Sequence, residues 1–121
     1  MNSYTTATLL PTTVYGTASG NYDGSSQEFT GNSIPAANYY NGQGNLQTIA
    51  YNVSGFQGII SIQATLQDNP DQSAWFEIDS FGDGSTIITE YHPVSVTGNF
   101  AHLRAHVAQF DAGTIAVTAS Y

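Results

Sequence analysis

Apolar and polar residues alternate with a period of two through much of this chain. Ile49, Tyr51 and Val53 occupy alternate positions, and the same alternation recurs over 58–66 and 114–121. Because side chains two positions apart point to the same face of a β-strand, this pattern is typical of strands that bury one face. Turn residues separate the alternating segments at the spacing typical of a sandwich or barrel. We therefore predict an all-β fold, specifically a β-sandwich of jelly-roll type.

The alternation also predicts which side chains face the core. The inward set is expected to comprise Ile49, Tyr51, Ile60, Ile62, Leu66, Phe76, Ile78, Leu103, Val107, Ile115 and Val117. Around residue 75, the pattern places Phe76 and Ile78 inside. Trp75, Glu77 and Asp79 fall on the opposite face of the same segment.

The segment 99–110 fits two different periodicities. Leu103, Ala105 and Val107 alternate as in a strand, whereas Leu103 and Val107 also fit helical spacing with the phenylalanines near the segment's ends. We favour the strand, because it forms a hairpin with the C-terminal strand through an Asp-Ala-Gly turn at 111–113. A strand also avoids an isolated helix in an otherwise β-rich chain.

The 121 residues fit a single domain with two differently patterned parts. Residues 1–45 are rich in Thr, Ser, Asn and Gly and only weakly periodic, so we predict an extended arm or edge strands. Residues 46–121 are predicted to form the β-sandwich core, with turns at 68–71 and 82–85, where Asx and Gly or Pro residues cluster. The N-terminus lacks the basic and apolar regions of a signal peptide, so none is expected.

Charge limits the partners that the chain can bind. A single Lys or Arg residue stands against nine Asp and Glu residues, which gives a formal net charge of -8. Binding to nucleic acid or to an anionic membrane needs several cationic side chains, so neither partner is expected. The chain has no Cys, which excludes disulfides and thiolate chemistry.

No catalytic, cofactor or metal site is predicted, so we expect the chain not to be an enzyme. His102 and His106 would lie roughly 13 Å apart on a strand, too far to share a metal ion, although a helix would bring them close enough. Asp79, Asp83 and Glu90 match positions of a calcium loop, but a phenylalanine occupies the loop's third position. Turn formation and solubility are the simpler explanation of these carboxylates.

Contacts with partners are the stronger prediction. The candidates for an interface are Trp75, Tyr91, His102, Arg104 and His106. Trp75 lies opposite inward apolar residues, so it is either an exposed contact residue or is covered by the N-terminal segment. Arg104 is expected to pair with a carboxylate of its own chain or of a neighbour, because a guanidinium binds carboxylates bidentately. The candidate carboxylates are Glu77, Asp79 and Glu90.

The C-terminal part of the chain resembles a known family. The run from Gly98 to Val107, followed by Phe110–Ile115 and an alternating end at Tyr121, resembles the closing hairpin of small β-sandwich virion proteins. Such proteins occur in tailed bacteriophages, including the contractile-tailed phages of marine cyanobacteria. The resemblance implies a structural, non-enzymatic component of a virion, in head decoration, neck, tail or fibre attachment. It also implies a homo-oligomer, with a trimer favoured by analogy, that contacts other virion proteins.

A carbohydrate-binding β-sandwich is the competing prediction. Trp75, Tyr91 or the pair Tyr39 and Tyr40 would serve as platforms for sugar rings, and Asp or Asn side chains would supply hydrogen bonds. Titration with defined sugars distinguishes this function from a purely structural one.

Overall fold

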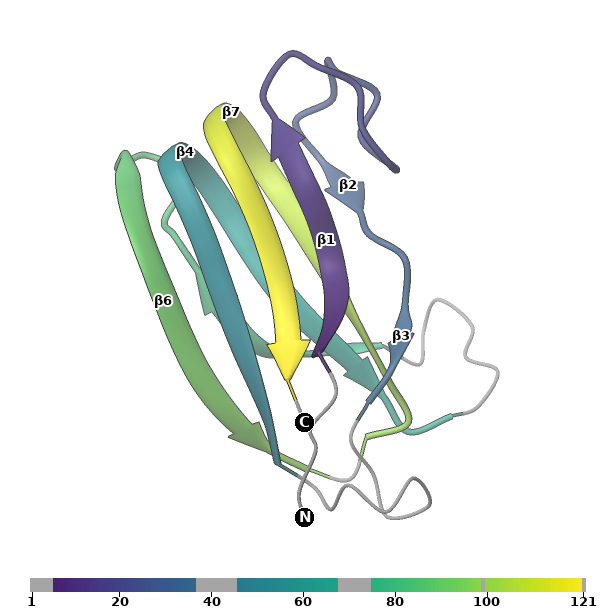
Figure 1. Cartoon of the computed structure of the whole chain (residues 1–121). Helices are drawn as coiled ribbons and strands as arrows, with labels where there is room; N and C mark the ends of the chain where they lie inside the picture. Colours follow the sequence, from purple (N-terminus) through teal and green to yellow (C-terminus); the bar gives the residue numbers. More distant parts are fainter. Residues whose placement is uncertain (1–5, 37–45, 68–74, 99, 121) are drawn as a thin grey trace.

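β-Strands make up the regular structure of the part of the chain that can be described. The computed structural model describes residues 6–36, 46–67, 75–98 and 100–120 (Figure 1). The strands are β1 (Thr6–Val14), β2 (Phe29–Thr30), β3 (Ile34–Pro35), β4 (Leu46–Thr65), β5 (Phe76–Phe81), β6 (Ile88–Thr97) and β7 (His102–Ser120). They pair antiparallel within one sheet, which confirms the prediction of an all-β fold. Within these ranges no helix is long and apolar enough to cross a membrane.

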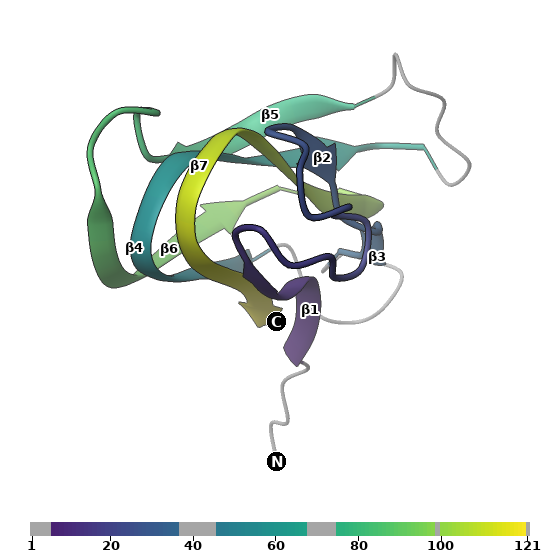
Figure 2. The ribbon, with the colours of Figure 1, turned by 90° about the horizontal axis from the view of Figure 1, so that it is seen from above.

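The two longest strands, β4 and β7, form a continuous antiparallel ribbon. β4 has 20 residues and β7 has 19, and their pairing runs from Thr48 opposite Ser120 to Thr65 opposite His102. Both strands curl over at the middle, as the view from above makes clear (Figure 2). The bend coincides with register shifts between Ser54 and Ile59. The ribbon therefore has two halves that lie on either side of one bend.

Glycines with positive φ produce this bend. Gly55 has φ 62° and Gly113 has φ 103°, a region that other residues rarely adopt. Our prediction of a hairpin turn at 111–113 is wrong, because Ala112 still pairs with Gln57 and β7 runs through the segment. The separate strands expected before and after Gly55 are likewise one strand. A glycine kink in each of two paired strands bends the ribbon without breaking its ladder.

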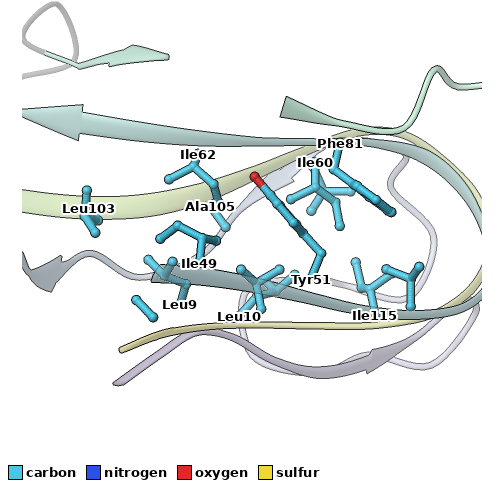
Figure 3. Close-up of a cluster of buried hydrophobic side chains, with 14 of the residues drawn as sticks. Leu9, Leu10, Ile49, Tyr51, Ile60, Ile62, Phe81, Leu103, Ala105 and Ile115 are labelled. Atoms are coloured by element: carbon cyan, nitrogen blue, oxygen red, sulfur yellow. The ribbon is translucent and has the colours of Figure 1, made fainter. Parts of the chain in front are cut away.

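Each half of the ribbon carries its own flanking strands. In the first half the order is β1, residues 114–120 of β7, residues 48–54 of β4, and β6. In the second half β2 and β3 pair with residues 102–107 of β7, and β5 pairs with residues 60–64 of β4. The inner faces of the two halves enclose one cluster of buried apolar side chains (Figure 3).

The segment 99–110 is a strand from His102 onward, as we favoured. Leu103, Ala105 and Val107 are fully buried, and the residues between them are only partly buried. A helix would have required local i to i−4 hydrogen bonds, whereas here both β4 and the short N-terminal strands pair with this segment. Pairing on both sides overrides the helical spacing of its phenylalanines.

Most of the residues predicted to face inward lie in the core, but the prediction is wrong for two of them. Leu66 is 68% exposed and Phe76 is 41% exposed, whereas the other predicted residues are buried or, for Ile78, partly buried against the core. Leu66 lies just after the last residue of β4, where the strand's alternation no longer applies. Phe76 begins the edge strand β5 and packs edge-on against Phe100, with ring centroids 6.0 Å apart.

The N-terminal segment contributes to the core more than its sequence suggested. Leu9, Leu10, Tyr22 and Phe29 are all buried. β1 lies against β7 from Thr6 to Val14, so residues 6–14 form an edge strand of their own sheet and not an arm that leaves it. Pairing with β7 satisfies the backbone groups along one side of this strand, and its two leucines are buried. The remainder of the predicted arm at 1–5 and 37–45, and the predicted turn at 68–71, lie outside the described residues.

Two Asp-Gly-Ser turns have the same structure. Asp83 Oδ1 accepts the backbone N–H groups of Ser85 and Thr86 at 2.9 and 2.8 Å. Asp23 Oδ1 accepts those of Ser25 and Ser26 at 2.8 and 2.7 Å. These backbone hydrogen bonds lower the pKa of both carboxyl groups to about 2. The turn predicted at 82–85 is therefore present and closed by its aspartate.

We predict that the ribbon tolerates no side chain at Gly113. A Cβ there would lie 2.5 Å from Phe56 Cα and 2.6 Å from the Gly55 carbonyl, whereas one at Gly16, where φ is 88°, would meet nothing within 4 Å. Both Gly113→Ala and Gly16→Ala incur the backbone strain of positive φ, about 1–3 kcal/mol. Urea denaturation should show a further loss of roughly 2 kcal/mol in Gly113→Ala alone. Equal losses in the two variants would contradict a close approach of the strands at this point.

The Asp83 turn should contribute fully to stability above about pH 4 and progressively less as the pH falls towards 2. The folded pKa of about 2 lies below the ordinary value of 3.8, so the stabilisation is complete above that value and is lost as the pH falls through about 2. Asp83→Asn removes this titration, so its free energy of unfolding should decline less between pH 5 and pH 2 than that of the unsubstituted protein. Asp23→Asn should behave alike, and unchanged acid dependence in both variants would count against the turn's role.

Candidate functional site

Four of the predicted interface residues lie on the outer face of the second half of the sheet. His102, Arg104 and His106 alternate along β7 between the buried residues of that strand. Trp75, directly before β5, contacts this row from the opposite edge. We call this surface the Trp75 face, which comprises Trp75, Glu77 and Ser80, then Ser61 and Gln63, then His102, Arg104 and His106, and finally Glu28 and Thr30.

Arg104 is held at the centre of the Trp75 face. Its Nε donates a hydrogen bond to Gln63 Oε1 at 2.6 Å, and its guanidinium carbon lies 4.3 Å from the centroid of the Trp75 ring. Gln63, on β4, is the cross-strand partner of Arg104 on β7 and of Glu77 on β5. Partial burial of the guanidinium lowers the pKa of Arg104 from its ordinary value. The only Trp and the only Lys or Arg of the chain thus form a cation–π pair.

His106 links β7 to β2 and to the residue that precedes it. Its Nε2 lies 3.0 Å from Glu28 Oε2 and its Nδ1 lies 2.8 Å from Thr30 Oγ1. Because an ionised carboxylate only accepts hydrogen bonds, Nε2 donates to Glu28, and in the neutral ring Nδ1 then accepts from the Thr30 hydroxyl. β2 has two residues. These side-chain bonds therefore supplement a very short ladder.

The Thr30–His106–Glu28 arrangement has the order of a nucleophile, a base and an orienting acid. Acyl transfer needs in addition preorganised donors for the oxyanion and exclusion of water. The Glu28 side chain is 70% exposed, and Thr30 and His106 are cross-strand partners on an open sheet face. In this setting the hydrogen bonds among the three side chains are best explained as contacts that hold β2 against β7.

Tyr91 does not join the other candidates. It lies on β6 in the first half of the sheet, opposite Asn52, and is 65% exposed. Trp75 directly precedes β5 in the second half of the sheet, and the two halves enclose one core between them, so Tyr91 and Trp75 belong to different surfaces of the protein.

A β-bulge in β5 separates two carboxylates that we expected on one face. Gln63 pairs with Glu77 and the adjacent Ile62 pairs with Asp79, so β5 has one extra residue, Ile78. Asp79 consequently turns inward, where its Oδ2 accepts a hydrogen bond of 2.5 Å from the hydroxyl of buried Tyr51. Burial, and then the bond to Asp79, raise the pKa of Tyr51. An extra residue in one strand leaves no mark on the periodicity of its neighbour, so sequence alone missed this pair.

Two of the three candidate partners of Arg104, and the candidate calcium ligands, have other roles, whereas Glu77 lies on the Trp75 face across Gln63 from Arg104. Glu90 lies 2.9 Å from His92 Nδ1, Asp79 bonds Tyr51, and Asp83 closes its own turn. The ring of His92 also packs on Phe81, at 5.4 Å between centroids. Among the residues whose structure is described, no group of three or more His, Cys, Asp or Glu side chains could hold a metal ion.

Comparison with known proteins gives no independent identification. No protein-family model, no curated protein and no solved structure matches the chain.

Proposed function

We propose that the protein is a non-enzymatic structural component of a tailed-phage virion, acting through contacts of its sheet faces with copies of itself and with other virion proteins. The single observation that carries the proposal is the Trp75–Arg104 pair on an outer sheet face. Trp and Arg are the residue types most enriched among the energetically dominant contacts of protein interfaces. Gln63 holds the guanidinium in place before a partner arrives, which reduces the entropy lost on binding.

The strand order supports the finer proposal of a jelly-roll sandwich. If each half of β4 and of β7 is counted as a strand, and β2 with β3 as one, the chain has eight strands in sequence. The first half of the sheet then has the order 1-8-3-6, and the second half has the order 2-7-4-5. This is the order of a jelly roll, a double Greek key that recurs in viral capsid proteins.

Carbohydrate binding is the second candidate, and Trp75 also favours it. A partly exposed indole beside an amide and hydroxyl groups suits an uncharged sugar ring. The Arg104 guanidinium covers part of the indole, which leaves less of the ring for stacking and favours the protein partner instead.

The fluorescence of Trp75 provides a direct test, because it is the only tryptophan and reports on this face alone. The protein should be detected by mass spectrometry in purified virions of the phage that encodes it, in many copies per particle. Purified protein added to particles that lack it should bind with a change in Trp75 emission. Absence from virions together with a saturable response to a neutral oligosaccharide would replace the structural proposal with the glycan one.

Arg104→Gln should weaken attachment to such particles two- to tenfold, because it removes the guanidinium that is proposed to contact the partner, a charged contact worth about 0.5–1.5 kcal/mol. Thr17→Gln, at an exposed position outside the strands, is the matched control and should attach normally. Binding isotherms at two salt concentrations measure the effect. If Arg104→Gln attaches as well as the control at both salt concentrations, Arg104 does not contribute to the interface.

A further inference from the structure

The outer face of the first half differs from the Trp75 face in that its outward side chains are uncharged. Ile49, Val53 and Val117 of its strands are buried, so the residues that alternate with them point outward. The register aligns these outward residues in rows across β1, β7, β4 and β6. We call them the hydroxyl face, which comprises Thr6, Thr8, Val14, Leu46, Thr48, Ala50, Asn52, Ser54, Tyr91, Pro93, Ser95, Thr97, Thr114, Ala116, Thr118 and Ser120.

The hydroxyl face contains no charged side chain, although the chain has a net charge of -8. Within the paired segments of this half, the Asp, Glu and His residues are Glu90 and His92, which stand opposite the inward residues Val53 and Tyr51 and bond to each other. Water-facing sheet surfaces of soluble proteins normally carry charges of both signs. Depletion of charge is instead typical of the central part of a protein interface.

The hydroxyl groups of this face are partly satisfied before any partner binds. Thr6 Oγ1 lies 3.3 Å from Ser120 Oγ, and Thr48 Oγ1 lies 3.1 Å from Ser95 Oγ. Covering such groups therefore breaks fewer hydrogen bonds with water than covering free hydroxyls would. The threonine methyl groups and the exposed rings and aliphatic chains of Tyr91, Val14 and Leu46 supply apolar area for a contact.

The edges of this half are less suited to a partner than its face. Pro11 lies in the edge strand β1 and Pro93 in the edge strand β6. Proline has no N–H to donate to an added strand, and its presence at an edge opposes strand-by-strand association. A partner of this half is therefore expected to stack on the sheet and not to extend it.

We propose that the hydroxyl face is where a second copy of this chain binds, sheet on sheet, in a two-fold dimer. Two chains of charge -8 repel each other, and a charge-free surface allows them to approach with the least opposition. Contact between identical faces produces a two-fold axis. The inference rests on the self-association in the proposed function and identifies its surface, and it leaves the Trp75 face for a different virion component.

Sedimentation velocity of the full chain over roughly 1–200 µM tests this, the range in which modest interfaces associate. The unsubstituted protein should form dimers without a change in Trp75 emission, because Trp75 lies on the other outer face. Thr118→Glu places two like charges in the contact and should weaken dimerisation at least tenfold. Ser95→Glu repeats the test on β6, where the side chain is exposed, and guards against a folding defect at Thr118.

Ser80→Glu is the matched control, since it adds the same charge at an exposed site on the Trp75 face and should still dimerise. Three results would overturn the inference: a trimer, a dimer that survives both Thr118→Glu and Ser95→Glu, or association that changes Trp75 emission. Each of these leaves the proposed virion function intact, because self-association persists through another surface. A protein that stays monomeric throughout the range and is absent from virions contradicts both.

Discussion

The whole sheet depends on one ribbon that bends without losing its pairing. Every other strand hydrogen-bonds to β4 or to β7, so the positions of β1, β2, β3, β5 and β6 follow from the path of these two. The bend is possible because Gly55 and Gly113 both adopt positive φ, and because Gly113 has no Cβ that would collide with the backbone of Gly55 and Phe56. The stability of the fold and the separation of the two outer faces therefore both depend on the backbone conformation at these two glycines.

The bend also determines which outward side chains lie on each outer face. Alternation sends every second residue of β4 and β7 outward, and after the bend the outward residues of each strand belong to a different surface. His102, Arg104 and His106 thus lie on one side with Trp75, whereas Thr114, Thr118 and Ser120 lie on the other. One long strand thus supplies a charged, aromatic surface and an uncharged one, the two surfaces to which the proposals above assign different partners.

A β-bulge provides a hydrogen-bond partner for a polar group near the core. The extra residue in β5 turns Asp79 toward the hydroxyl of Tyr51, a ring that also stacks on Phe81 at 4.9 Å between centroids. Without the bulge, a buried tyrosine hydroxyl would need another partner. At the surface, the carboxylates of Asp23 and Asp83 accept hydrogen bonds from the backbone of their own turns.

The sequence by itself determined the strand class and most of the core, because the period-two pattern is a local property of each strand. It assigned Ile49, Ile60 and Leu103 to the interior correctly, and it placed His102, Arg104 and His106 on one face. Only the tertiary structure decided that 111–113 bends a strand instead of ending one, since glycine occurs both in hairpin turns and at bends within strands. That outcome depends on a second kink at Gly55, more than fifty positions away in the chain, which lies directly against Gly113. The pairing of Trp75 with Arg104 and the inward turn of Asp79 likewise required register between distant strands, which local alternation does not specify.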